Sequence, residues 1–163
     1  MPVREVLVYP APILKEVARQ ATAEEAEAAL VDLLETMRAH DRCVGIAAPQ
    51  IGIPLRVALV DISSHPHGSG SHGLIKLVNP VVTHQSEGSK VSREGCLSLP
   101  DLTANVRRPR KATIETRGES IEVSGFEARC VLHEIDHLDG ILFLDRVASV
   151  TDDIFRRQSH RKG

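Results

Sequence analysis

Residues 133–137 read His-Glu-Ile-Asp-His, an HExxH motif that brings two imidazoles and a carboxylate together. On an α-helix, side chains four residues apart lie on the same face, so His133 and His137 can bind one metal ion. Glu134 lies about 100° round the helix from His133, within reach of a water molecule beside that metal. The motif therefore predicts a helix that holds a catalytic divalent metal.

The apolar residues within and beside the motif indicate that this helix is buried. Val131, Ile135 and Leu138 recur at spacings of four and three residues, which places one side of the helix against a core. Gly140 follows the last of them, at the position where a left-handed glycine commonly ends a helix. Two unrelated core histidines are the alternative interpretation, but such residues rarely form HExxH by chance.

A catalytic zinc-type site takes a third protein ligand and leaves one position open for water. The metzincin pattern HExxHxxGxxH would place a histidine at position 143, where this chain has phenylalanine. A downstream glutamate ligand is excluded too, because no glutamate follows Glu134. Asp145, Asp152 and Asp153 remain candidates, although each also fits a surface charge near a chain end. With one of them as ligand, the protein would be a zinc endopeptidase.

The other candidate for a third ligand lies upstream, where residues 94–98 read Glu-Gly-Cys-Leu-Ser. Together with Gly-Ile-Ala-Ala-Pro-Gln at 45–50 and the HExxH motif, this segment resembles the signature motifs of the peptide deformylase family, in order and in spacing. The resemblance extends from Val6 to Leu144. It implies an enzyme that removes the formyl group from the N-terminal formylmethionine of newly made proteins. It also implies one divalent metal, commonly iron(II) in cells, for which zinc, nickel or cobalt can substitute.

The resemblance assigns three metal ligands, Cys96, His133 and His137, with a water molecule in the fourth position. A metal lowers the pKa of a cysteine thiol enough for it to bind as thiolate. Glu134 is then expected to take the proton of the attacking water and to deliver it later to the leaving amine.

The resemblance also assigns the groups that contact the substrate. The Gln50 side-chain amide and the Leu97 backbone N–H would donate to the oxyanion that develops in the reaction. Gly45 would let the first motif approach the substrate backbone, and the side chains of Ile46 and Leu97 would face the methionine side chain. Gln50 has an alternative interpretation as a surface amide at a turn. The chain departs from the family pattern at Cys43, which adds a side chain where glycine is usual.

Three further residues near the motifs have structural interpretations. Glu94 is expected to pair with Arg107 or Arg108 and to hold its loop in place. Asp136 either orients a neighbouring group or faces solvent. Cys130 lies three residues before His133, and an inert core thiol is its favoured interpretation.

The remaining patterns predict an α+β fold in which antiparallel β-strands surround a central α-helix that carries the HExxH motif. Thr22 and Glu25 have the form of a capping box before an amphipathic helix at 23–39. One or two helical turns are expected at 13–18. Strands are predicted at 56–62, at 74–82 with a break at Asn79-Pro80, and in a hairpin of 111–117 and 120–126 around Gly118.

Two segments are predicted to carry little regular structure. The loop at 63–73 is rich in glycine and serine and holds His65, His67 and His72, so we expect a solvated loop, with a second metal site as the alternative. The polar tail at 149–163 is predicted to form a short helix that frays. It is shorter than the long final helix common in bacterial members of the family, which argues against ribosome docking through that helix. The ribosome near the exit tunnel stays an expected partner.

The composition limits the class of protein. A chain of 163 residues that is 42% hydrophobic is long enough for one domain, and we expect a single catalytic domain at 1–163 and a monomer. The net charge of -2 argues against direct nucleic-acid recognition, and no apolar stretch is long enough to span a membrane. Three cysteines cannot all pair within one chain, and no secretory signal follows Met1, so we expect reduced thiols and a cytoplasmic location. The partners implied by the resemblance are formyl-Met nascent peptides.

Overall fold

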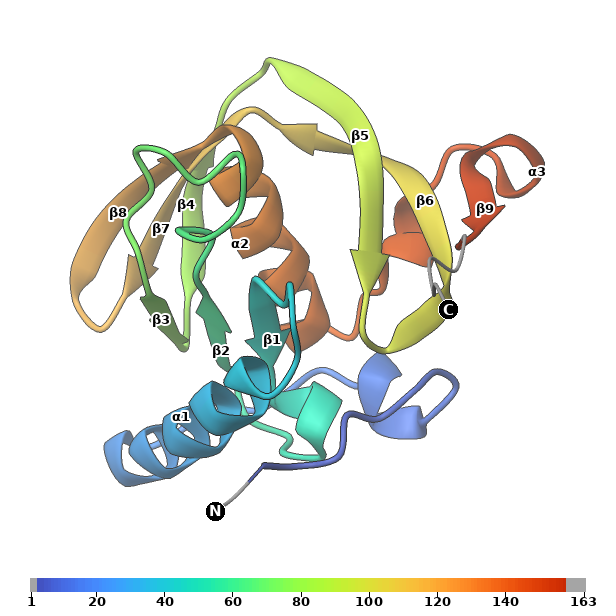
Figure 1. Cartoon of the computed structure of the whole chain (residues 1–163). Coiled ribbons are helices and arrows are strands. Elements are labelled where there is room, and N and C mark those ends of the chain that lie inside the picture. The colour runs from blue at the N-terminus through green and yellow to red at the C-terminus, as the bar shows by residue number, and fades with distance from the viewer. Residues whose placement is uncertain (1–2, 158–163) are drawn as a thin grey trace.

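The computed structural model describes residues 3–157 and has an α+β fold of antiparallel strands and few helices (Figure 1). In this part of the chain the first sheet contains β1 (Gly45–Ala47), β2 (Val57–Val60) and β3 (Ile75–Val78). The second contains β4 (Val81–Gln85), β7 (Lys111–Thr116) and β8 (Glu119–Ser124). The third contains β5 (Ser89–Cys96), β6 (Leu99–Pro109) and β9 (Ile154–Arg156). The α-helices are α1 (Ala23–Arg38), α2 (Gly125–Leu138) and α3 (Val150–Asp153), and the 3-10 helices are η1 (Pro12–Lys15), η2 (Ala48–Ile51) and η3 (Phe143–Arg146).

Helix α1 confirms the predicted amphipathic helix and its capping box. The Thr22 hydroxyl accepts a hydrogen bond from the Glu25 N–H, and the Glu25 carboxylate accepts one from the Thr22 N–H. Leu30, Leu33 and Met37 are buried, and the helix packs on β1 and β2. No helix in the described part of the chain has both the length and the apolar character needed to cross a membrane.

Helix α2 carries residues 133–137 and contacts strands of all three sheets, as Figure 1 shows for the orange helix. Most of its residues are buried. It ends as predicted, because Gly140 has a φ of 73° and a Cβ at that position would lie 2.7 Å from the Lys15 carbonyl oxygen. Arg56 Nη1 donates to the Leu138 carbonyl oxygen at 2.8 Å, so the last turn is also capped by a side chain.

The predicted hairpin is confirmed by β7 and β8, although α2 begins at Gly125, before the end of the second predicted strand at residue 126. Its turn consists of Arg117 and Gly118, both with positive φ, which is the conformation of a tight two-residue turn. The predicted break at Asn79-Pro80 is confirmed as well, because it separates β3 from β4.

Three segments differ from the sequence predictions. The helical turns expected at 13–18 are a short 3-10 helix, η1. The segment 94–98 lies in an unpredicted hairpin, in which Cys96 pairs with Leu99. The tail forms only the four-residue α3 before β9 pairs with Leu102–Ala104 of β6, so the helix prediction is wrong for 154–156. Residues 158–163 of the predicted tail helix lie outside the described residues.

Candidate metal centre and active site

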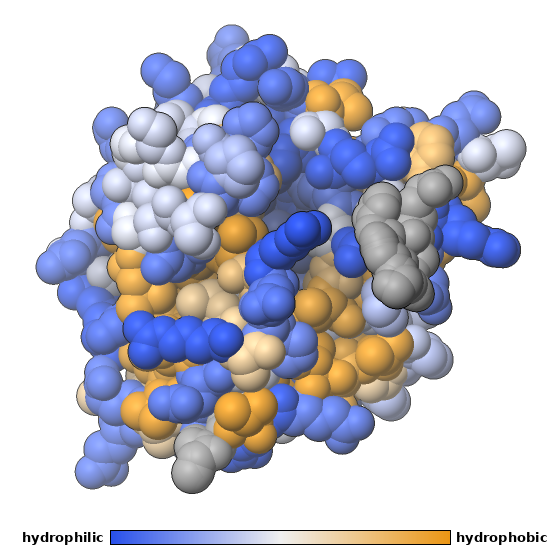
Figure 2. All heavy atoms as spheres, viewed as in Figure 1, coloured by the Kyte–Doolittle hydropathy of each residue, from blue (hydrophilic) through white to orange (hydrophobic). Residues whose placement is uncertain are grey.

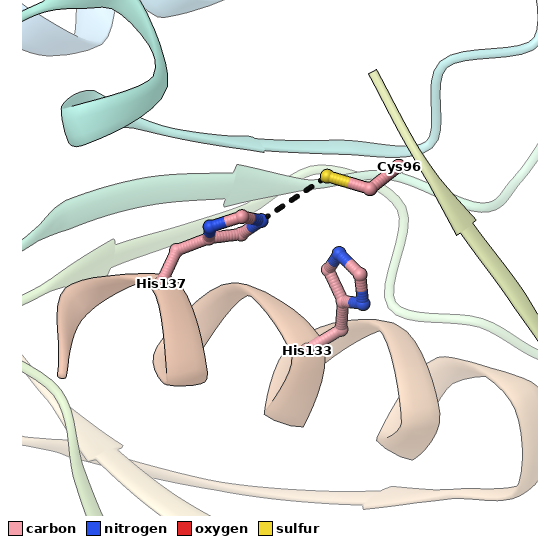
Figure 3. A group of neighbouring side chains, drawn as sticks. All are labelled: Cys96, His133 and His137. Carbon is pink, nitrogen blue, oxygen red and sulfur yellow. Dashed lines mark hydrogen bonds between the residues drawn. The ribbon is translucent and has the colours of Figure 1, made fainter. Parts of the chain in front are cut away.

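The last residue of β5 and two residues of α2 bring three metal-binding side chains together. The ligand atoms of Cys96, His133 and His137 all lie within 4.8 Å of one another, and Cys96 Sγ is 3.3 Å from His137 Nε2. Figure 3 shows both imidazoles projecting from one face of the helix toward the sulfur. Cys96 and His137 are buried, and 11% of the His133 side chain is exposed. The group has the composition of a site with one thiolate and two imidazole ligands.

The alternative carboxylate ligands are used elsewhere. Asp145 pairs with Lys15 and accepts a hydrogen bond from the Leu142 N–H. Asp152 and Asp153 bind the Ser149 hydroxyl and backbone N–H at the start of α3. None of these aspartates belongs to the candidate metal group formed within residues 3–157.

Glu134 lines the same cavity as the candidate ligands Cys96 and His133, with its side chain buried. Its Oε1 has no hydrogen-bond partner among the described residues, an unusual state for a buried carboxylate and one that fits a missing polar group beside it. A Cβ at position 45 would lie 2.7 Å from Glu134 Oε2. Gly45 was expected to make room for the substrate backbone, and here it makes room for this carboxylate. Burial raises the pKa of Glu134 to about 7.

Gln50 is buried, so its alternative interpretation as a surface amide is wrong. Its Oε1 accepts a hydrogen bond from the Ala47 N–H at 2.9 Å, which fixes the orientation of the amide. Its Nε2 donates to Ser98 Oγ at 3.1 Å and lies 3.5 Å from Cys96 Sγ. The amide N–H donors therefore face the candidate metal centre.

The two residues expected beside the methionine side chain lie in different surroundings. Leu97 lines the cavity from the β5–β6 turn, and its backbone N–H has no acceptor among the described residues. Ile46 is fully buried in a core cluster with α1 and does not line the cavity. Its expected contact with substrate is therefore corrected, because alternate residues of β1 face opposite sides and Gly45 takes the cavity side.

Glu94 holds the candidate ligand His133 in place. Its carboxylate accepts hydrogen bonds from Arg108 at 2.7 and 2.9 Å, from Arg129 at 2.7 Å and from His133 Nδ1 at 2.9 Å. This confirms the predicted pair with Arg108, whereas Arg107 binds the Ser89 hydroxyl instead. The contact occupies Nδ1 and leaves Nε2 of His133 available to a metal. Arg129 was missed, although it lies four residues before His133 and so on the same helix face.

Asp136 extends this network on the other side of α2. Its buried carboxylate accepts from Arg108 Nη1 at 2.7 Å, and from Arg146 Nε and Nη2 at 2.6 and 2.8 Å. Of the two interpretations considered for Asp136, orientation of a neighbour therefore holds and exposure to solvent does not. Arg146, in η3, carried no signal in the sequence.

The cavity at the metal group has a volume of about 410 Å³ and is lined by residues of β1 and β5 as well as α2. Figure 2 shows its opening as a hollow with hydrophilic side chains around it. A larger cavity of about 690 Å³ lies against the other side of α2, but it contains no candidate ligand, and most of its arginines are paired with Glu25, Glu94, Asp136 or Asp139. We therefore place the chemistry in the smaller cavity.

All three cysteines line this smaller cavity. The half-buried Cys43 thiol donates to the Gly45 carbonyl oxygen at 3.3 Å, and burial, followed by the nearby Glu134 carboxylate, raises its pKa to about 12. Burial also raises the pKa of Cys130. Both thiols therefore stay protonated and weakly reactive, in agreement with the inert role expected for Cys130.

The histidine-rich loop is anchored more firmly than predicted. The His65 ring stacks on Phe126 with centroids 4.3 Å apart, and His72 Nδ1 binds Glu127 at 2.7 Å. Both partners belong to the first turn of α2. His65, His67 and His72 form no candidate metal group in the described part of the chain, so nothing supports the second metal site.

Comparison with known proteins identifies the family to which this arrangement belongs. Residues 3–153 match the family model described as polypeptide deformylase. The chain is a member of the peptide deformylase family. Members of this family depend on a metal, and the group of Cys96, His133 and His137 offers this chain a site for one.

Individual relatives cover nearly the whole chain. The peptide deformylase of Bartonella tribocorum is 37% identical over 171 residues, which cover 99% of this chain and 94% of that protein. The crystal structure of the Thermotoga maritima peptide deformylase matches with a TM-score of 0.80 and 30% identity, and the match covers 91% and 100% of the two chains. An Acinetobacter baumannii peptide deformylase with bound Met-Ala-Ser matches with a TM-score of 0.78 and 34% identity, covering 89% and 98%.

Proposed function

We propose that this chain is a peptide deformylase, a metal-dependent hydrolase that removes the formyl group from formylmethionyl nascent polypeptides and releases formate. The proposal is carried by one observation in a member of this family: Cys96, His133 and His137 converge, and Cys96 and His133 line the same cavity as Glu134 and Gln50. We further propose that residues 1–163 act as one catalytic domain, with α2 as the central helix that carries the metal site.

The surroundings of the cavity favour an extended peptide as substrate. Strands β1 and β5 each lie at an edge of their sheet, and residues of both line the cavity. Free strand edges bind extended peptides through main-chain hydrogen bonds. The Acinetobacter baumannii relative, which has Met-Ala-Ser bound, supports the same substrate class. A peptide held between β1 and β5 would present its N-terminus to Cys96, at the end of β5.

The residues of the cavity divide the chemistry among them. A divalent metal held by Cys96, His133 and His137 would act as a Lewis acid that acidifies water and polarises the formyl carbonyl. Glu134 accepts the proton of the attacking water and returns it to the leaving amine, which breaks the formyl C–N bond. The Gln50 amide and the Leu97 N–H donate hydrogen bonds to the oxyanion of the tetrahedral intermediate.

We propose iron(II) as the metal in cells, with zinc(II), nickel(II) or cobalt(II) able to replace it. A site with one thiolate and two imidazoles accepts all four, because its ligands are soft or borderline. An iron-loaded enzyme should lose activity in air as the iron and Cys96 oxidise. Full activity after prolonged aeration without reductant would contradict the iron assignment.

The test of function is formate release from a formyl-Met peptide by anaerobically purified protein. We expect one metal per chain, and X-ray absorption should detect one sulfur and two nitrogen ligands from the protein. Cys96→Ala should lose the metal, whereas Cys43→Ala and Cys130→Ala, which remove thiols from the same cavity, should keep it. A metal-loaded protein that releases no formate would refute the function. A shell of only nitrogen and oxygen would refute the ligand set.

We also propose that the enzyme acts as a cytoplasmic monomer on chains that emerge from the ribosome. Its substrate is a newly made N-terminus, which is first accessible at the exit tunnel. Sedimentation with ribosomes that carry a formylated nascent chain, compared with empty ribosomes, would measure this contact. Equal failure to bind both would mean that the enzyme meets its substrates only after their release.

A further inference from the structure

Three exposed arginines line the cavity of the candidate metal centre, and none of them has a carboxylate partner among the described residues. Arg42, Arg93 and Arg157 all line the cavity and are exposed. None of the three forms an ion pair within residues 3–157. Asp41 is the one exposed carboxylate of this rim in the described part of the chain. The two carboxylates deeper in the cavity do not cancel this excess of positive charge, because Glu94 is bound by buried arginines and Glu134 is itself buried.

Strand β9 fixes two of these arginines in position. The Phe155 ring lies under the Arg93 guanidinium, with 3.8 Å between Cζ and the ring centroid. Arg93 also donates to Asn105 Oδ1 at 3.2 Å and Thr103 Oγ1 at 3.3 Å. The Arg157 N–H binds the Asp101 carbonyl oxygen at 2.7 Å, and its guanidinium lies so close to Gly95 that a Cβ there would be 2.1 Å from Nη2.

The positions of Arg93 and Arg157 relative to β5 indicate which residues of a bound peptide would lie beside them. Gly95 directly precedes Cys96, and Arg93 lies three residues before it along β5. At about 3.3 Å per residue, Arg93 is about 10 Å along the strand from the ligand cysteine. An extended peptide whose formyl group lies at Cys96 therefore brings its second to fourth residues past Arg157 and Arg93.

We propose that Arg93 and Arg157, with Arg42 across the cavity, select formyl-Met peptides that carry aspartate or glutamate at the second to fourth positions. This inference rests on the proposed deformylase function and adds a charge preference to it. Arginine suits the role because its planar guanidinium can bind a carboxylate through two parallel hydrogen bonds. Since all three side chains are exposed, the preference is modest and falls as salt screens it.

The experiment compares three amidated peptides of equal length, formyl-Met-Ala-Glu-Glu, formyl-Met-Ala-Gln-Gln and formyl-Met-Ala-Lys-Lys. At low ionic strength kcat/KM should fall in that order, with a ratio of about 3- to 20-fold between the Glu and Lys peptides. The ratio should shrink toward one in 0.5 M salt, where the Debye length is only about 4 Å. Arg157→Gln and Arg93→Gln should each reduce it, and Arg157→Glu should bring it close to one, because the rim then carries two arginines and two exposed carboxylates.

Arg107→Gln is the matched control. Arg107 is exposed on the neighbouring strand β6, but it lines the larger cavity and binds Ser89, so all three rates should stay as in the parent. Equal rates on the Glu and Lys peptides would overturn the charge preference while leaving the function intact. The same would follow if Arg107→Gln changed the ratio as much as Arg157→Gln, because net charge alone would then explain it. Absence of hydrolysis of the Gln peptide would instead refute the proposed function.

Discussion

Glu94 and Glu134 are two buried carboxylates that line the same cavity in opposite surroundings. Glu94 accepts hydrogen bonds from two arginines and His133, whereas Glu134 Oε1 has no partner among the described residues. Burial favours the neutral form of both. For Glu94, the hydrogen bonds from Arg108 and His133 outweigh burial and hold its pKa below the ordinary value. For Glu134 burial dominates and raises its pKa to about 7.

The difference separates a structural carboxylate from a chemical one. A carboxylate bound by arginines keeps its charge and its place, and so can orient an imidazole. A carboxylate without a partner, with a pKa near neutrality, can take up and release a proton at physiological pH. A divalent cation beside Glu134 would lower that pKa in a metal-loaded protein. Each of the following substitutions tests one side of this contrast.

The largest effect is expected for Glu134→Gln, which keeps the size of the side chain and removes the base. The variant should hold its metal and bind formyl-Met peptides about as well as the parent. Its kcat should fall by roughly 10²- to 10⁴-fold, the usual contribution of a positioned general base. Metal content and kcat measured on the same preparation decide the point, and a metal-loaded variant with normal turnover would remove Glu134 from the mechanism.

The same variant has a pH signature in the metal-free protein. Between pH 4.5 and about 7 the folded parent holds a proton on Glu134 that the unfolded chain has lost, so the parent loses stability as pH rises through this range. Glu134→Gln lacks that loss, and its stability relative to the parent should increase from pH 4.5 to 7. Glu127→Gln is the control on the same helix, because Glu127 binds His72 outside the cavity; it should leave kcat nearly unchanged.

Glu94→Gln should mainly lower the stability of the fold, and it should affect the chemistry only through the metal site. It leaves the buried guanidinium groups of Arg108 and Arg129 without their shared negative charge, a change that typically costs about 3–5 kcal/mol. It also weakens the acceptor for His133 Nδ1, so metal affinity should fall by about 10- to 100-fold. Denaturant unfolding and metal competition measure the two effects.

The pH dependence of Glu94→Gln should have the opposite sign to that of Glu134→Gln. The Glu94 contribution is present above its unfolded pKa of 4.5 and is lost as pH falls toward its lower folded pKa. The gap between parent and variant should therefore close in acid. Asp139→Asn removes an exposed partner of Arg56 and should cost below about 1 kcal/mol. Equal costs for Asp139→Asn and Glu94→Gln would mean that burial does not set the strength of these pairs.

Gln50→Ala is expected to remove about 3 kcal/mol of transition-state stabilisation through the loss of one oxyanion donor. We expect a lower kcat and an unchanged metal content, because Gln50 is not one of the proposed metal ligands. Gln85→Ala, at an exposed position of β4, is the control. A loss that appears only in KM would assign Gln50 to substrate binding instead.

Features that depend on neighbouring residues were predictable from the sequence. The capping box at Thr22, the hairpin turn at Gly118 and the left-handed Gly140 each follow from residue types a few positions apart. The order of the three motifs identified the family, and in this chain residues of all three motifs converge on one site. Cys96 and the two histidines are far apart in sequence, and the resemblance rather than the spacing joined them.

Features that depend on pairing between distant segments were not predictable. Arg146 binds Asp136 from η3, and β9 adds to β6 after a polar segment that resembles a frayed helix. The position of Ile46 depends on which residues of β1 face α1, and that register is set by the pairing with β2. Each of these outcomes follows from tertiary contacts that leave no local pattern in the chain.

The smallest effect is expected for Arg146→Ala, at the exposed end of the network that contains Glu94. Arg146 donates two hydrogen bonds to Asp136, but 42% of its side chain is exposed and Arg108 stays bound to the same carboxylate. We therefore expect a loss of stability below about 1 kcal/mol that shrinks in high salt, whereas the loss from Glu94→Gln should persist. Denaturant unfolding of both variants at low and high salt makes the comparison. If Arg146→Ala lowers the stability as much as Glu94→Gln does, the Asp136 carboxylate depends on both of its arginines. Burial alone would then not distinguish the structural carboxylates from the carboxylate proposed to act in the chemistry.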